Sequence, residues 1–150
     1  MEYRVTKYNP ANRNELGHYL NSEEWTEFAD VGHSVSLEEY ERTENAYIET
    51  ALEFISNSGI NELKVVELED NNLKSNYKEN DIVKNKAISD ILRSLLRSEL
   101  WCKLESEYGF IHIGWDYYMY LGLSHVGNKV IENAGNRGLY VESYSSPYHT

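Results

Sequence analysis

The order and spacing of the apolar residues predict an α+β fold, in which two main helices pack on a largely antiparallel sheet. Two stretches, 37–57 and 83–96, repeat apolar residues at the three- and four-residue steps of a helix. The other structured stretches are short and rich in branched and aromatic residues, as strands are. A length of 150 residues suits one domain with a core of its own, so we expect a single domain over residues 1–150.

The chain is expected to open with a strand and a long loop. Residues 3–8 alternate in residue type and are rich in strand formers, and Asn9-Pro10 ends them. Residues 11–35 contain many Asn, Ser and Gly, which predicts a loop that carries Tyr19, Trp25 and Phe28. A loop of this length inside a compact domain is usually either functional or the result of a wrong assignment of elements.

Local signals define the first helix well. Ser36 and Glu39 form a capping-box pattern, and Ser58-Gly59 is a stop signal, which bounds the helix at about 37–57. One face is apolar, and Glu38, Glu41, Glu49 and Glu53 lie opposite. The apolar stripe consists of Leu37, Tyr40, Tyr47, Ile48, Ala51, Leu52 and Ile55.

The second helix should begin after a cap at Asn80 or Asp81. Its apolar stripe is Val83, Ala87, Ile88, Ile91, Leu92, Leu95 and Leu96. Further strands are expected at 63–68, 100–105, 110–115, 117–121 and 139–144, with a hairpin turn at 105–109 and a helical turn at 128–134.

Composition argues against several classes of protein. The single cysteine, Cys102, forms no internal disulfide and no cysteine zinc site, and the five histidines lack metal-ligand spacing. No phosphate-binding glycine loop is present, so we expect no cofactor and no metal. Neither a signal peptide nor a membrane-spanning run is visible, which predicts a cytoplasmic protein.

Charge is the strongest functional signal. The formal net charge is −11, which disfavours nucleic acid and anionic membranes and favours basic partners. Residues 15–53 hold 11 acidic side chains and one basic side chain, Arg42. Mixed signs would solvate a surface without this self-repulsion. The pattern therefore indicates a basic protein partner, for example an enzyme that cleaves nucleic acid and carries a positive substrate surface.

Two other chemistries stay open. His112 with Asp116 or Glu105 would supply the groups of a small hydrolase, if they converge. The aromatic run around Trp115, Tyr118 and Tyr120 would place half of its rings in the core, and the other half could form a sugar-binding surface. Cys102 lies on an apolar face of its expected strand, so we interpret it as an inert core residue.

Several stretches resemble small bacterial immunity proteins, which are encoded beside polymorphic or contact-dependent growth-inhibition toxins. The stretches are Tyr3–Pro10, Glu24-Trp25-Thr26, Asp30-Val31-Gly32, Leu100–Glu105, Gly114–Tyr120 and Ser146-Pro147-Tyr148. The resemblance implies an antitoxin that binds the C-terminal domain of a cognate toxin in the cytosol and blocks it without catalysis. It carries over no contact residue.

Charge and aromatic content alone suggest the contacts. Acidic side chains would pair with lysines and arginines of the toxin, and aromatic side chains would act as anchors buried in the interface. The expected acidic contacts are Glu23, Glu24, Glu27, Asp30, Glu38 and Glu41, and the expected anchors are Tyr19, Trp25 and Tyr118.

Overall fold

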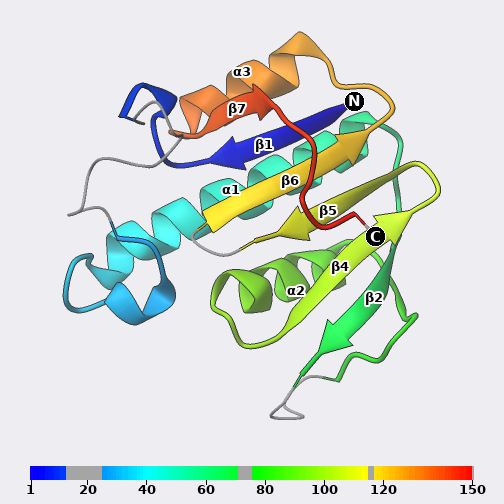
Figure 1. The fold of residues 1–150 in the computed structure, drawn as a ribbon, viewed down its shortest axis with the longest axis horizontal. Helices are drawn as coiled ribbons and strands as arrows, with labels where there is room; N and C mark the ends of the chain where they lie inside the picture. Colours follow the sequence, from blue (N-terminus) through cyan, green and yellow to red (C-terminus); the bar gives the residue numbers. More distant parts are fainter. Residues whose placement is uncertain (13–24, 71–75, 115–116, 150) are drawn as a thin grey trace.

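One seven-stranded sheet organises the molecule, and every pair of neighbouring strands in it is antiparallel (Figure 1). The computed structural model describes residues 1–12, 25–70, 76–114 and 117–149. The strands lie in the order β3-β2-β4-β5-β6-β1-β7. They are β1 (Glu2–Thr6), β2 (Leu63–Glu69), β3 (Ile82–Val83), β4 (Trp101–Ser106), β5 (Gly109–Ile113), β6 (Tyr118–Leu123) and β7 (Tyr140–Ser143).

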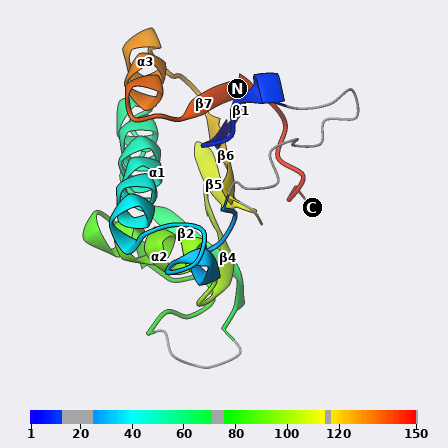
Figure 2. The same ribbon diagram turned by 90° about the vertical axis from the view of Figure 1, so that its left-hand side faces the viewer.

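All three described helices cover the same face of the sheet (Figure 2). They are α1 (Leu37–Asn57), α2 (Lys86–Leu96) and α3 (Asn128–Asn136), and α1 contacts both of the others. We call the opposite side the helix-free face. The predicted α+β class is confirmed, and the sheet is antiparallel throughout the described chain.

The first helix has the predicted bounds, because the signals that set them are local. The Glu39 backbone N–H donates to Ser36 Oγ over 3.1 Å, which satisfies one of the free donors of the first turn. The apolar stripe is buried except at two positions: Leu52 is partly buried, and Leu37, in the first turn, is half exposed.

The start of the second helix was predicted wrongly. Helix α2 begins at Lys86, after Asn85, and the expected caps lie in the turn before β3. Asp81 Oδ2 accepts from the Lys78 backbone N–H over 2.8 Å, and Asn80 has a positive φ of 72°. Val83 is buried as expected, but it pairs with Leu63 across β2 and β3. Apolar spacing alone did not distinguish that strand pair from a helical turn.

The later strands follow the prediction within a residue or two at most ends. The 105–109 turn joins β4 to β5, with Ser106 paired to Gly109. Strand β5 ends at Ile113, two residues before the predicted end, and β6 extends two residues further, to Leu123. The helical turn expected at 128–134 is the helix α3.

A cluster of tyrosines binds the helical layer to the sheet. The Tyr47 hydroxyl donates to the Tyr117 carbonyl over 2.6 Å, and the Tyr117 hydroxyl donates to the Leu96 carbonyl over 3.0 Å. The Tyr40 and Tyr117 hydroxyl groups also bond to each other. All three rings are buried, so each needs a polar partner, and the cluster supplies one.

Within the described ranges, none of the helices has both the length and the apolar character that a membrane crossing demands.

Candidate functional site

Four of the predicted acidic contacts gather at one end of the molecule. Glu27 precedes the short 3-10 helix η2 (Phe28–Asp30), and Glu38 and Glu41 lie in the first turns of α1. Glu27, Glu38 and Glu41 are exposed, whereas Asp30 is half-buried. Asp30 Oδ2 accepts from the backbone N–H groups of Thr26 and Glu27 over 2.9 and 3.3 Å, so this carboxylate also shapes the loop. Glu23, Glu24 and Tyr19 lie outside the described residues.

Basic residues from the second half of the chain neutralise part of the acidic segment. Glu44 is fully buried between α1 and α2 and binds both Arg93 and Arg97. Arg137 reaches Glu53 over 3.0 Å and Glu49 over 3.5 Å. The charge imbalance of 15–53 is therefore smaller in three dimensions than in sequence, because its counter-charges are distant in the chain.

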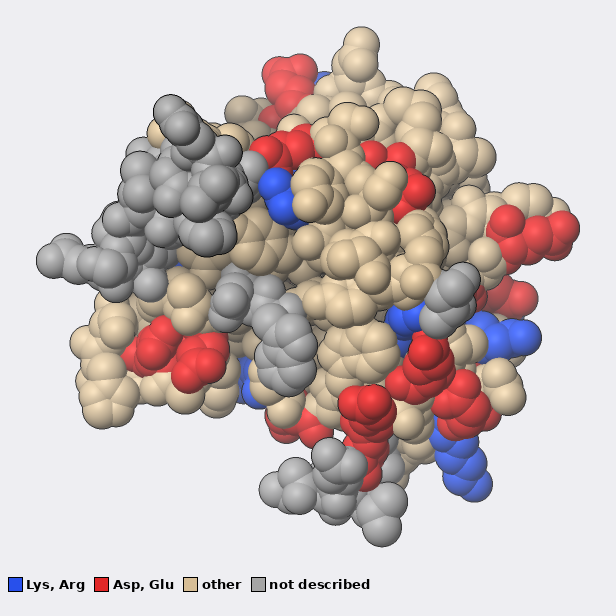
Figure 3. Space-filling view, viewed as in Figure 1, with Lys and Arg blue, Asp and Glu red and all other residues tan. Residues whose placement is uncertain are grey.

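The carboxylates near η2 and the start of α1 are not neutralised in this way. We call them the acidic end: Glu27, Asp30, Glu38, Glu39 and Glu41. Among the residues that the structure describes, none of these carboxylates takes part in an ion pair. Figure 3 shows red carboxylates where Figure 1 places η2 and the start of α1, and further groups around the rim of the helix-free face. The centre of that face carries little charge.

The two described aromatic anchors lie in different surroundings. Trp25 belongs to the protein's own core: 6% of it is exposed, and its ring packs on Tyr40 and Tyr117 at 5.4 and 5.1 Å. It is therefore not accessible to a partner, and the sequence missed this because Trp25 comes from a loop. Tyr118 is half-buried on the helix-free face, where the Arg4 guanidinium lies 5.2 Å from its ring centroid.

The C-terminal segment 144–149 crosses the helix-free face, as the red chain in Figure 1 shows. Its Tyr148 ring lies 5.7 Å from Trp101 and 5.9 Å from Tyr120. The His149 side chain is 2.6 Å from Glu2 Oε1, which also accepts from the Ser146 backbone N–H over 3.1 Å. The bond to His149 is the main cause of a lowered Glu2 pKa. The aromatic sheet surface is thus partly covered by the chain itself.

His112 fastens this segment to the sheet from below. It is fully buried, and its Nδ1 lies 2.7 Å from Ser146 Oγ and its Nε2 2.8 Å from Glu105 Oε2. Burial lowers the His112 pKa, the Glu105 carboxylate opposes that effect, and Lys103 reinforces it. The neutral ring consequently donates from Nε2 to Glu105 and accepts the Ser146 hydroxyl proton at Nδ1.

Ser146, His112 and Glu105 lie at the distances expected of a nucleophile, a base and an acid, but Ser146 and His112 are buried, so a substrate cannot reach them. Ser146 is 6% exposed, and its oxygen also accepts from the Tyr148 backbone N–H over 3.1 Å. The hollow described below does not include Ser146 or His112. The hydrogen bonds of His112 to Ser146 and Glu105 attach the C-terminal segment to the sheet, and we call this arrangement the clasp. The other proposed hydrolase residue, Asp116, lies outside the described residues.

Two glycines on the helix-free face make room for aromatic rings, and sequence reasoning missed both. A Cβ at Gly114 would lie 2.5 Å from the Tyr148 hydroxyl oxygen. A Cβ at Gly122 would lie 1.9 Å from the nearest carbon of the Phe110 ring, so it would collide with that ring. The signal in the sequence was a glycine inside or beside a strand, which often marks close approach.

Cys102 is a core residue, as expected. It is fully buried, and burial raises the pKa of its thiol to about 12, so it is a poor nucleophile. No group of three or more metal-ligating side chains occurs in the part of the chain that the structure describes.

Comparison with known proteins identifies no relative: no family model, no curated protein and no solved structure matches this chain.

Proposed function

We propose that this protein is an immunity protein, which binds and neutralises a cognate bacterial toxin domain in the cytosol and catalyses no reaction itself. The acidic end is the observation that carries the proposal. Its five carboxylates have no ion-pair partner among the described residues, while Arg4, Arg93, Arg97 and Arg137 are used in internal pairs. Such a surface attracts a cationic protein from solution.

The chemistry of a nuclease toxin fits this surface. An enzyme that binds nucleic acid needs lysines and arginines for the phosphates, and carboxylates can occupy the same positive site. The resemblance of several sequence stretches to immunity proteins of contact-dependent growth inhibition supports the same assignment. The clasp arrangement of His112 supports a binding role over the hydrolase alternative.

The test begins with the gene next to this one, which we expect to encode a large secreted protein with a variable C-terminal domain. That domain should co-purify with this protein, and co-expression should protect cells from it. The association rate should fall at least tenfold between about 0.05 M and about 0.5 M NaCl, because salt screens electrostatic steering. A rate that does not change with salt contradicts an electrostatic mechanism.

A pair of matched variants locates the surface. The triple variant Glu27→Gln, Glu38→Gln, Glu41→Gln removes three charges from the acidic end, and we expect it to slow association roughly tenfold. The control Glu62→Gln, Asp90→Asn, Glu132→Gln removes three exposed charges elsewhere and should change the rate less than about twofold. Equal effects in the two variants would show that total charge matters and the acidic end does not.

A further inference from the structure

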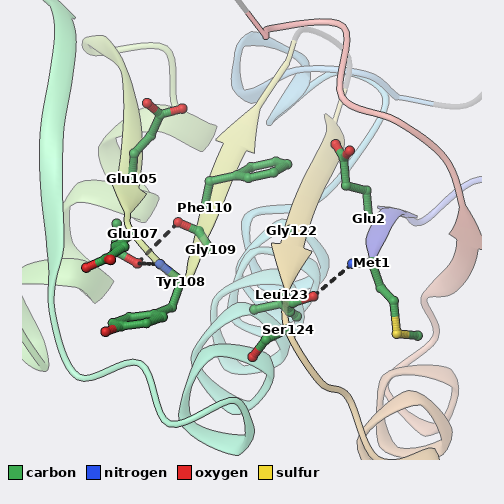
Figure 4. A pocket seen from close by; sticks show the side chains of 11 residues that line it. Met1, Glu2, Glu105, Glu107, Tyr108, Gly109, Phe110, Gly122, Leu123 and Ser124 are labelled. Atoms are coloured by element: carbon green, nitrogen blue, oxygen red, sulfur yellow. Dashed lines mark hydrogen bonds between the residues drawn. The ribbon is translucent and has the colours of Figure 1, made fainter.

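A hollow of about 400 Å³ opens where the β4–β5 hairpin meets β6 and β1. We call it the hairpin hollow; it is lined by Met1, Glu2, residues 105–110 and residues 122–124. Figure 4 shows the Phe110 ring between the Glu105 and Glu2 side chains, with Tyr108 on the opposite side. The hollow is open to solvent, so it suits one side chain of a docked protein better than an enclosed small molecule.

Aromatic rings form two parts of its wall. Tyr108 is 66% exposed, the second most exposed large apolar side chain among the described residues, and it does not pack into the core. Phe110 is fixed: it stacks on the His112 ring with centroids 4.1 Å apart and lies across Gly122, where a Cβ would collide with it. The rigid ring requires no ordering when a ligand binds.

Carboxylates with spare acceptor atoms form the rest of the wall. Glu105 uses Oε2 for His112, and Glu2 uses Oε1 for the C-terminal segment. The hydrogen bonds found among the described residues leave Glu105 Oε1, Glu2 Oε2 and the exposed Glu107 carboxylate without a partner. Glu105 and Glu2 are held in place by the hydrogen bonds of their other oxygens.

Among the residues that the structure describes, no lysine or arginine lines the hollow; the terminal ammonium group beside it donates to the Leu123 carbonyl over 3.0 Å. An arginine side chain complements this wall better than any other. Its planar guanidinium stacks on aromatic rings, is weakly hydrated and donates in several directions to carboxylates.

We propose that an arginine of the partner toxin docks in the hairpin hollow, with its side chain on the aromatic wall formed by Tyr108 and Phe110 and its N–H groups donating to the nearest of the free carboxylate oxygens of Glu105, Glu107 and Glu2. The identity of the partner rests on the proposed function. The contact is separate from the acidic end, so the two sites together define a wide docking surface on a basic protein.

Arginine binding in the hairpin hollow can be tested without the toxin. The full-length protein, labelled with ¹⁵N, is titrated with N-acetyl-arginine N-methylamide and, separately, with the lysine and norleucine analogues. We expect saturable shifts at the amides of 107–110 and 122–124 with the arginine probe, weaker binding of the lysine probe, and none of the norleucine probe. Absence of saturable shifts, or equal shifts with norleucine, overturns the proposal.

Exposed side chains allow variants that leave the fold intact. Tyr108→Ala and Glu107→Gln should each weaken binding of the arginine probe about two- to fivefold, the size of one exposed cation–π or ionic contact. The controls Tyr140→Ala and Glu132→Gln alter an exposed tyrosine and an exposed glutamate outside the hollow, and should leave the affinity unchanged. Equal losses in variants and controls also overturn the proposal.

The same variants separate this inference from the proposed function. If the toxin binds the protein and Tyr108→Ala with Glu107→Gln leaves that affinity unchanged, the docking inference is wrong and the immunity function stands. If no toxin domain binds at all, the immunity function is wrong, whatever the arginine probe does.

Discussion

A single buried histidine connects the sheet to the end of the chain. His112 is neutral because burial removes the water that would hydrate its charged form, and its two ring nitrogens form hydrogen bonds with Glu105 and Ser146. The titratable groups that act on it are Glu105, Lys103 and His149. Protonation at Nδ1 would remove the acceptor of the Ser146 hydroxyl, so acid should loosen the C-terminal segment.

The sign of the pH dependence follows from the direction of the His112 shift. Its pKa is lowered in the folded protein, whereas the unfolded chain has the ordinary value near 6.5, so the unfolded state binds more protons as pH falls below about 6.5. The free energy of unfolding by urea should therefore decrease between about pH 7 and about pH 5. In His112→Gln this slope should be shallower, and at pH 7 the loss of the clasp should cost about 1–2 kcal/mol.

A direct readout is the imidazole proton resonance of His112, whose titration midpoint should lie below the ordinary value near 6.5. An unchanged slope in His112→Gln would contradict the role given to this side chain.

At the scale of elements, an ion pair between helices compensates for the acidity of α1. Glu44 is buried and receives Arg93 and Arg97 from α2, and the Arg97 guanidinium also lies 4.7 Å from the Phe28 ring. One carboxylate thus holds α1, α2 and the η2 segment together. The Glu44 pair raises the Arg97 pKa above its ordinary value, so the guanidinium stays charged.

Glu44→Gln should be strongly destabilising. It leaves two arginines, 38% and 24% exposed, without their counter-charge, and breaking such a pair costs about 3 kcal/mol. Urea unfolding followed by circular dichroism measures the loss. Glu49→Gln is the matched control on the same helix: it touches Arg137 from an exposed position and should cost less than about 1 kcal/mol.

The sequence predicted those elements whose signals are local, and it missed those set by distant pairing. Helix α1 has its cap, Ser36, and its stop, Ser58-Gly59, in the residues that directly flank it, so its bounds are confirmed. Strand β3 has only two residues and exists because Val83 pairs with Leu63, which no local pattern reveals. Glu105 and His112 lie on the two strands of the expected hairpin, where they are diagonal neighbours, whereas Ser146 lies 34 residues further along the chain than His112.

At the scale of the whole molecule, net charge works against compactness. The formal charge is −11, and internal pairs relieve only part of the repulsion among the carboxylates. Surface ion pairs contribute little, so screening the long-range repulsion should outweigh weakening them.

Added salt should therefore stabilise the free protein. We expect the melting temperature to rise by roughly 2–4 °C between about 0.05 M and about 0.5 M NaCl, equivalent to about 1 kcal/mol for a domain of this size. Differential scanning calorimetry in a weakly interacting buffer measures it, and KCl should have the same effect as NaCl. A falling melting temperature would mean that ion pairs dominate. The same salt slows the proposed association, so stability and binding should respond in opposite directions.

Strand β1 lies between β6 and β7, so residues 2–6 pair with residues 118–122 and 140–143. Residues 2–6 therefore find their neighbours only after residues 118–122 and 140–143 have been synthesised, and contacts this distant in sequence form slowly. A nascent chain that stops before residue 143 has no completed sheet. A cell that relied on this protein for protection would need a standing pool of finished molecules before any toxin arrived.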